Sequence, residues 1–387
     1  MEKALIKSGI WTAGLTILFL LVIWNHNSTI EIITAVIFFV LLYFIFFSIG
    51  REEVADRINK FTGLTIKRTI IFPAVLIVLF YTYILIHGQN PFQGTVLMLP
   101  FLIFFPSLVF VAKADNSQKI DWLDFTTFTL FLLPTTLVEF SPDTYLPFGG
   151  GGFDSVYRII IIIAIVYAFV VVRNLKDVGF YPILKLKYLW TATWVWLVFY
   201  ASVFVIAYAV DFLKFVGYDD ALSVLLVSIG ISVLRVFLHT AIFEELFFRG
   251  LLQNMLSKRI YQNNSWESFW KWGGAILLVL SLITGYFMEG DKFWFPALIT
   301  VLLFLVAYFI ERSNISKKGT YTALAITSVI FGLVHYHSGS IIFVGLASIG
   351  GWAYGYTYIK TKNVFYAALV HALVNSSHMI FGLELMK

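Results

Sequence analysis

Two adjacent carboxylates and an arginine interrupt an apolar stretch of the chain, which reads His239-Thr-Ala-Ile-Phe-Glu-Glu-Leu-Phe-Phe-Arg-Gly250. Ionisable side chains are costly in hydrocarbon and seldom occur there without a function. On an α-helix, Glu245 and Arg249 are four residues apart and share a face, with the acid N-terminal to the base, the better order for an ion pair. Glu244 is turned about 100° away. The spacing predicts one carboxylate held by Arg249 and a second carboxylate available for chemistry.

Histidines late in the chain supply the other groups that such chemistry needs. His335 ends the run Phe331-Gly-Leu-Val-His, and His371 and Asn375 lie one helical turn apart in the last apolar run. A carboxylate can take a proton from water while an imidazole positions the water or protonates a leaving amine. An amide or imidazole N–H can stabilise an oxyanion. Together these residues favour hydrolysis at a polar site built from three separate helices.

The composition identifies the elements that must position these residues. Of the 387 residues, 60% are hydrophobic and 13% are charged, against about 25% charged residues in a soluble domain. We therefore expect an all-α, polytopic transmembrane helical bundle, a multi-pass protein of the cell membrane. The chain has no cysteine, which excludes disulfides and thiolate metal ligands. The net charge of +5 comes from no basic tail or patch, so no nucleic-acid partner is expected.

Apolar runs long enough to cross a bilayer, about 17–25 residues, number about thirteen, from 8–24 to 364–382. The first run has no cleavage site and is expected to be retained. If each run crosses once, 21 Lys and Arg lie on one side of the membrane and four on the other, and two lie within a span. The positive-inside rule then predicts a cytoplasmic N-terminus.

The segment 221–256, which contains the two glutamates, is too long for one perpendicular span. Its 36 residues correspond to about 54 Å of helix, against a hydrocarbon core of roughly 30 Å. We expect this segment to tilt, to break near Gly230, or to leave the membrane at its cytoplasmic end.

Three motifs in this chain resemble the signature of the CAAX protease and bacteriocin-processing family of intramembrane endopeptidases, which includes the type II CAAX prenyl endopeptidase. That signature is Glu-Glu-x-x-x-Arg, Phe-x-x-x-His and His-x-x-x-Asn, each on its own transmembrane helix. Each motif alone is weak, but all three in order within apolar helices form a strong signal. The resemblance covers about residues 188–382, and its motifs are Glu244-Glu245-x-x-x-Arg249, Phe331-x-x-x-His335 and His371-x-x-x-Asn375.

The resemblance implies a role for each matched residue. Glu244 is expected to be the general base that activates water, with His335 as its partner. His371 and Asn375 are expected to line the oxyanion site, and the Glu245–Arg249 pair is expected to support the site structurally.

The use of a metal stays open at this stage. If a metal such as zinc is bound, the expected ligands are Glu244, His335 and His371, since carboxylate and imidazole groups both ligate zinc. Activation of water by the glutamate without a metal is equally compatible with the residues. The sequence does not decide between the two.

We divide the chain into an N-terminal multi-span region of unknown role, 1–187, and a CAAX-protease-like peptidase domain, 188–387. Arg249 and His335 are 86 residues apart in the sequence, more than the family resemblance suggests. The excess contains two apparent spans, which predict a helical hairpin inserted near 265–312. Such a hairpin adds an even number of crossings and preserves the orientation of the helices on either side.

The predicted function is that of an intramembrane endopeptidase whose substrate is a membrane-associated or lipidated protein or peptide, either prenylated or bacteriocin-like. Two other classes of protein remain as alternatives. One is a non-catalytic membrane scaffold or bacteriocin self-immunity protein that keeps the protease fold. The other is an ion-coupled transporter, since intramembrane ionisable residues also mark ion pathways. The physiological substrate and the oligomeric state do not follow from the sequence.

Overall fold

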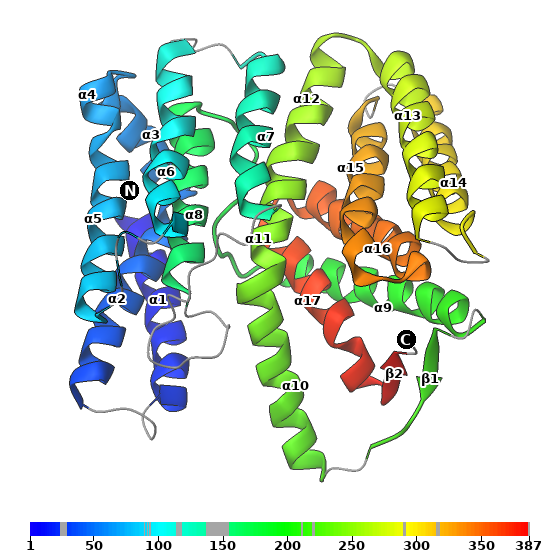
Figure 1. Cartoon of the computed structure of the whole chain (residues 1–387), viewed down its shortest axis with the longest axis horizontal. Coiled ribbons are helices and arrows are strands. Elements are labelled where there is room, and N and C mark those ends of the chain that lie inside the picture. Colours follow the sequence, from blue (N-terminus) through cyan, green and yellow to red (C-terminus); the bar gives the residue numbers. More distant parts are fainter. Residues whose placement is uncertain are drawn as a thin grey trace. The chain divides into compact units, whose positions relative to one another are not determined.

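The computed structural model is a helical protein with one short two-stranded sheet (Figure 1). The all-α fold class predicted from the composition is therefore confirmed. The chain divides into two compact units, unit 1 (Met1–Ile183) and unit 2 (Leu184–Lys387). The structure describes residues 1–23, 29–88, 90, 92, 94–113, 118–136, 155–209, 212–218, 221–288, 292–314 and 318–385.

Unit 1 consists of apolar helices, joined in part by two short polar ones. The amphipathic α3 and the single-turn α4 lie between two hydrophobic helices, α2 and α5, and together contain seven charged residues. Its helices are α1 (Glu2–Ile23), α2 (Thr29–Ile49), α3 (Glu52–Thr62), α4 (Ile66–Thr69), α5 (Ile71–Ile86), α6 (Gly94–Lys113), α7 (Trp122–Thr136), α8 (Val156–Val166) and the π-helical η1 (Tyr167–Val172).

A buried ionic cluster joins the ends of α6, α7 and η1. Asp124 is fully buried and accepts hydrogen bonds from Arg173 Nε at 2.5 Å and Nη2 at 3.2 Å. Lys113 lies 2.9 Å from Asp121 and 3.5 Å from Asp124. Burial raises the pKa of Asp121, but the hydrogen bond and charge of Lys113 and the backbone N–H groups outweigh it, so this pKa is lower than usual. The cluster holds three helix ends together.

Unit 2 contains the residues singled out by the sequence. A short antiparallel ladder pairs Lys214 with Glu384, whose side chains lie 2.7 Å apart, and joins the start of α10 to the end of α17. Its elements are α9 (Leu186–Ala209), β1 (Leu213–Phe215), α10 (Leu222–Val236), η2 (Phe237–Ala241), α11 (Ile242–Glu245), η3 (Leu246–Gln253), α12 (Asn254–Gln262), α13 (Trp266–Phe287), α14 (Phe295–Arg312), α15 (Thr320–Val334), η5 (His335–Ser338), α16 (Ile341–Thr361), α17 (Val364–Ile380) and β2 (Leu383–Leu385).

The segment from α10 to α12 forms one uninterrupted helical run of 41 residues, seen in Figure 1 as the long helix of unit 2. Of the three possibilities for this segment, a break near Gly230 is wrong, because α10 continues through this residue. In hydrocarbon a broken helix leaves backbone groups without partners, which favours continuation. Two π-helical segments, η2 and η3, instead lie on either side of the two glutamates. Such segments are rare and are frequent at functional sites.

Among the described residues, seven helices are long and apolar enough to cross a membrane, and four shorter apolar helices accompany them. The seven long helices correspond to seven of the thirteen predicted spans, and the four shorter ones lie at the positions of another four. The other two, near 321–338 and 340–358, fold as α15 and α16, which meet at η5. The protein is therefore a multi-pass helical membrane protein.

Glu311 ties the helical hairpin of α13 and α14 to the start of α15. It is fully buried at the end of α14 and accepts hydrogen bonds from Thr322 N at 3.0 Å and Thr322 Oγ1 at 2.6 Å. The Trp266 indole N–H, from the start of α13, donates to the same carboxylate. Glu311 thus caps the first turn of α15, so the hairpin supports the helix that ends at His335.

Helices α15 and α16 approach closely because small residues lie between them. A Cβ added to Gly332 would lie 1.9 Å from Ser348 Oγ and 2.5 Å from Val344 O. One added to Gly355 would lie 2.3 Å from a methyl carbon of Leu324. Small residues at such positions allow the backbone contact that holds helices together in membranes.

We expect Gly332→Ala to destabilise the protein by about 1–3 kcal/mol, because the added methyl group forces α15 and α16 apart. The measurement is the thermal unfolding midpoint in detergent. Gly230→Ala is the matched control, since a Cβ there meets no atom within 4 Å and alanine favours a helix. Equal midpoints for the Gly332 variant and the wild type would contradict the close packing.

Candidate active site

Glu245 is the centre of a buried chain of polar contacts. Its Oε2 accepts a hydrogen bond from Arg249 Nε at 2.9 Å, and its Oε1 accepts one from His371 Nδ1 at 2.9 Å. Both Glu245 and Arg249 are fully buried. Arg249 Nη1 also donates to Thr327 on α15 at 3.3 Å, and its guanidinium lies 5.3 Å from the centre of the Phe331 ring. These polar contacts therefore link α11, η3, α15 and α17.

The contact with Glu245 fixes the tautomer and direction of the His371 ring. A carboxylate can only accept, so Nδ1 of His371 carries a proton and donates it. In the neutral imidazole, Nε2 is then left as an acceptor. Nε2 lies 4.0 Å from Oε2 of Glu244. The buried imidazole is thus held by one glutamate through one nitrogen and faces the other glutamate with its second nitrogen.

Glu244 is the more accessible of the two glutamates. Its side chain is 25% exposed, whereas that of Glu245 is fully buried. Its Oε2 atom is nevertheless buried and has no hydrogen-bond partner among the described residues. An unpaired buried oxygen is uncommon in folded proteins and often marks a catalytic position or a site for water. Glu244 therefore combines access from outside with an unused acceptor that faces His371.

His335 contacts the Phe331 ring, which also contacts His371 of this cluster. It begins the 3-10 turn η5, and its Nδ1 donates to the Phe331 carbonyl at 2.7 Å. The Phe331 ring contacts both imidazoles, with centroid distances of 4.7 Å to His335 and 5.7 Å to His371. Within the described part of the chain, no hydrogen bond or ion pair joins His335 to either glutamate. The structure thus brings His335 to the site's edge, one aromatic ring from His371.

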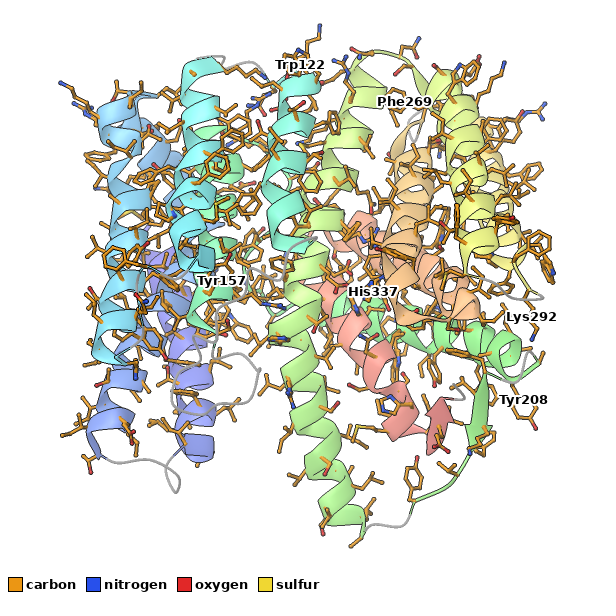
Figure 2. All side chains as sticks on the ribbon, in the orientation of Figure 1. Trp122, Tyr157, Tyr208, Phe269, Lys292 and His337 are labelled. Atoms are coloured by element: carbon orange, nitrogen blue, oxygen red, sulfur yellow. The ribbon has the colours of Figure 1, made fainter. Side chains whose placement is uncertain are left out.

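Asn375 and His337 occupy more exposed positions near the site. Asn375 follows His371 by one turn of α17 and is exposed. His337 is also exposed, stacks on His335 with 5.9 Å between ring centres, and is seen near α16 in Figure 2. Both residues can meet a molecule that approaches from outside.

Tyr354 on α16 is a residue of the site that the sequence did not reveal. Its ring stacks on that of His371 with 4.5 Å between centres and 7° between planes. Tyr354 also meets the Phe331 ring edge-on at 5.8 Å. The chain contains 20 tyrosines, and neither the spacing nor the surroundings of Tyr354 in the sequence distinguish it from the others.

The arrangement does not fit the metal site expected from Glu244, His335 and His371. Only Glu244 and His371 approach each other, and the Phe331 ring contacts both His335 and His371. In the part of the chain that the structure describes, no group of three or more His, Asp or Glu residues is arranged to hold a metal ion.

These features define a multi-pass helical membrane protein whose C-terminal unit encloses a carboxylate–imidazole site. A family model described as "Type II CAAX prenyl endopeptidase Rce1-like" matches residues 226–316 and 308–377. This C-terminal region is therefore similar to the CAAX-protease-like family, as the three motifs predicted, and the match supports a CAAX-type intramembrane protease at the level of the family. Comparison with curated proteins and with solved structures gave no match.

Proposed function

We propose that unit 2 hydrolyses a peptide bond by attack of a water molecule activated between Glu244 and His371. The observation that supports this most is the 4.0 Å separation of Glu244 Oε2 and His371 Nε2. At this distance a water molecule can contact both atoms. Both atoms are hydrogen-bond acceptors, so they can hold the two hydrogens of one water. The oxygen lone pairs then point away from the protein groups, toward a substrate carbonyl.

The reaction follows from these contacts. Glu244 takes a proton as the water oxygen bonds to the carbonyl carbon, and the carbonyl electron pair moves to its oxygen. The tetrahedral intermediate collapses when the C–N bond breaks. The proton held by Glu244 passes to the leaving nitrogen, so that the products are a carboxyl group and an amine. Glu245 and Arg249 keep His371 in the required tautomer throughout.

His335 and Asn375 are proposed to act on the substrate oxygen. The family resemblance pairs His335 with Glu244 and places His371 beside Asn375, whereas the distances favour His371 as the imidazole next to Glu244. The exposed Asn375 amide can donate to an oxyanion or to the substrate backbone. Because Nδ1 of His335 donates to the Phe331 carbonyl, Nε2 of His335 is an acceptor in the neutral ring and donates to an oxyanion only when the imidazole is protonated.

The proposed substrate is a protein or peptide held at the membrane, either prenylated or bacteriocin-like. The proposed location is the cell membrane, with the N-terminus in the cytoplasm: if each of the thirteen apolar runs crosses once, 21 Lys and Arg lie on that side against four on the other. Unit 1 is proposed to be a scaffold, a surface for substrate access, or a partner-binding region.

The function is tested by proteolysis with the purified full-length protein in detergent. Quenched fluorescent peptides, with and without a prenyl group, are offered as substrates. We expect cleavage that continues in the presence of a chelator, because Glu244, His335 and His371 are not gathered into a metal site among the residues that the structure describes. Cleavage that the chelator stops and zinc restores would instead indicate a bound metal. Absence of cleavage by folded protein, across prenylated and unmodified peptides, would favour the non-catalytic scaffold.

A further inference from the structure

We infer that Tyr354 is a positioning residue for hydrolysis, which holds the imidazole of His371 so that Nε2 faces Glu244. This inference rests on the proposed function and adds a residue outside the three motifs. It starts from the stacked contact between the two rings, which are nearly parallel and 4.5 Å apart.

Three contacts hold the buried His371 ring. Nδ1 is bound to Glu245, one face lies on Tyr354, and Phe331 meets the ring edge-to-face at an angle of 83°. The hydrogen bond anchors Nδ1, but coupled rotations about the Cα–Cβ and Cβ–Cγ bonds can still tilt the ring plane while this bond is kept. A flat ring against its face opposes that tilt, since the stack is lost when the plane changes. The direction of Nε2 toward Glu244 therefore depends on Tyr354.

Tyr354 is itself held firmly. Its side chain is 3% exposed, and the Phe331 and Phe199 rings lie 5.8 Å and 6.4 Å from it. A Cβ added to Gly350 would lie 3.1 Å from the Tyr354 hydroxyl, so this glycine leaves the space that the phenol occupies. The stacking surface is rigid, which a positioning role requires.

Glu244, Glu245 and Arg249 also lie close enough to Tyr354 to interact with it electrostatically. The tyrosine therefore belongs to the same cluster as the proposed base, although it is contributed by a separate helix, α16. Because the ring face makes the contact, we expect the aromatic ring to matter and the hydroxyl to matter little.

The test compares Tyr354→Leu and Tyr354→Phe in the full-length protein. We expect Tyr354→Leu to lower kcat by about 10–100-fold, since a small misplacement of a catalytic group has effects of this size, while KM stays unchanged. Tyr354→Phe should keep most of the activity because it retains the stack. Tyr356→Leu, a neighbouring tyrosine of α16, is the control, and Tyr354→Met fills the space without a ring if the leucine variant does not fold.

A second readout does not depend on cleavage. In protein labelled at its seven histidines, the His371 NMR signals, assigned with His371→Gln, carry the ring-current shift of a stacked phenol. Tyr354→Leu should remove this shift and Tyr354→Phe should keep it. Wild-type kcat in the leucine and methionine variants, or an unchanged shift, overturns the inference while the peptidase stands. A wild-type protein that cleaves no peptide overturns the proposed function, and the inference falls with it even if the NMR result shows the stack.

Discussion

Glu244→Gln is expected to lower kcat for peptide hydrolysis by about 10²–10⁴-fold, the usual contribution of a general base. The amide has the shape of the carboxylate but cannot take a proton from water. Glu244 makes no ion pair with Arg249, and its Oε2 has no hydrogen-bond partner among the described residues. The substitution also removes one of two adjacent negative charges, so we expect the thermal midpoint to stay equal to that of the wild type or to rise.

The measurement is kcat at saturating substrate together with the thermal midpoint in the same detergent. Glu267→Gln is the matched control, because Glu267 is an exposed glutamate at the start of α13 and should change neither quantity. If Glu244→Gln cleaved at the wild-type rate, Glu244 would have no part in catalysis and Glu245 or a histidine would have to supply the base. A variant with lost activity and a much lower midpoint would show a structural role instead.

The helical architecture follows largely from the sequence, because apolar runs of membrane length admit few other folds. The family and the ion-pair spacing follow from the three motifs. The π-helical segments η2 and η3 do not, since their residues have the same apolar pattern as an α-helix. The uninterrupted helix at Gly230 is a second feature that the apolar pattern did not predict. Glycine weakens a helix in water, but where no neighbouring group can satisfy the freed backbone, the hydrogen-bonded helix persists.

The sequence indicates which residues form the site better than it indicates how those residues are arranged. Spacing along one helix brings Glu245 and Arg249 together, since residues four apart lie on the same face, one turn apart. Which imidazole faces which carboxylate depends on the tilt and register of α15 and α17, and no local pattern encodes these. The stack of Tyr354 on His371 has the same origin, because α16 and α17 meet through three-dimensional packing alone.

Arg249→Met is expected to destabilise the protein by about 3–5 kcal/mol, the cost of leaving one partner of a buried ion pair uncompensated. Glu245 and Arg249 are both fully buried, and the arginine also contacts Thr327. Methionine fills a similar volume, so the loss reports charge and hydrogen bonding and not a cavity. The midpoint of unfolding in a detergent titration measures the effect. Lys214→Met is the control, since the Lys214–Glu384 pair is about half exposed and exposed pairs contribute about 0–1 kcal/mol.

The double variant Glu245→Gln/Arg249→Met separates stability from catalysis. It removes both charges, so most of the lost stability should return, because no unpaired charge remains buried. Catalysis should not return, since His371 has lost the carboxylate that fixes its tautomer and Nε2 no longer reliably accepts from water. Recovery of both stability and kcat would mean that the Glu245–Arg249 pair only supports the fold. Recovery of stability alone would show that this pair sets the direction of the imidazole on which hydrolysis at Glu244 depends.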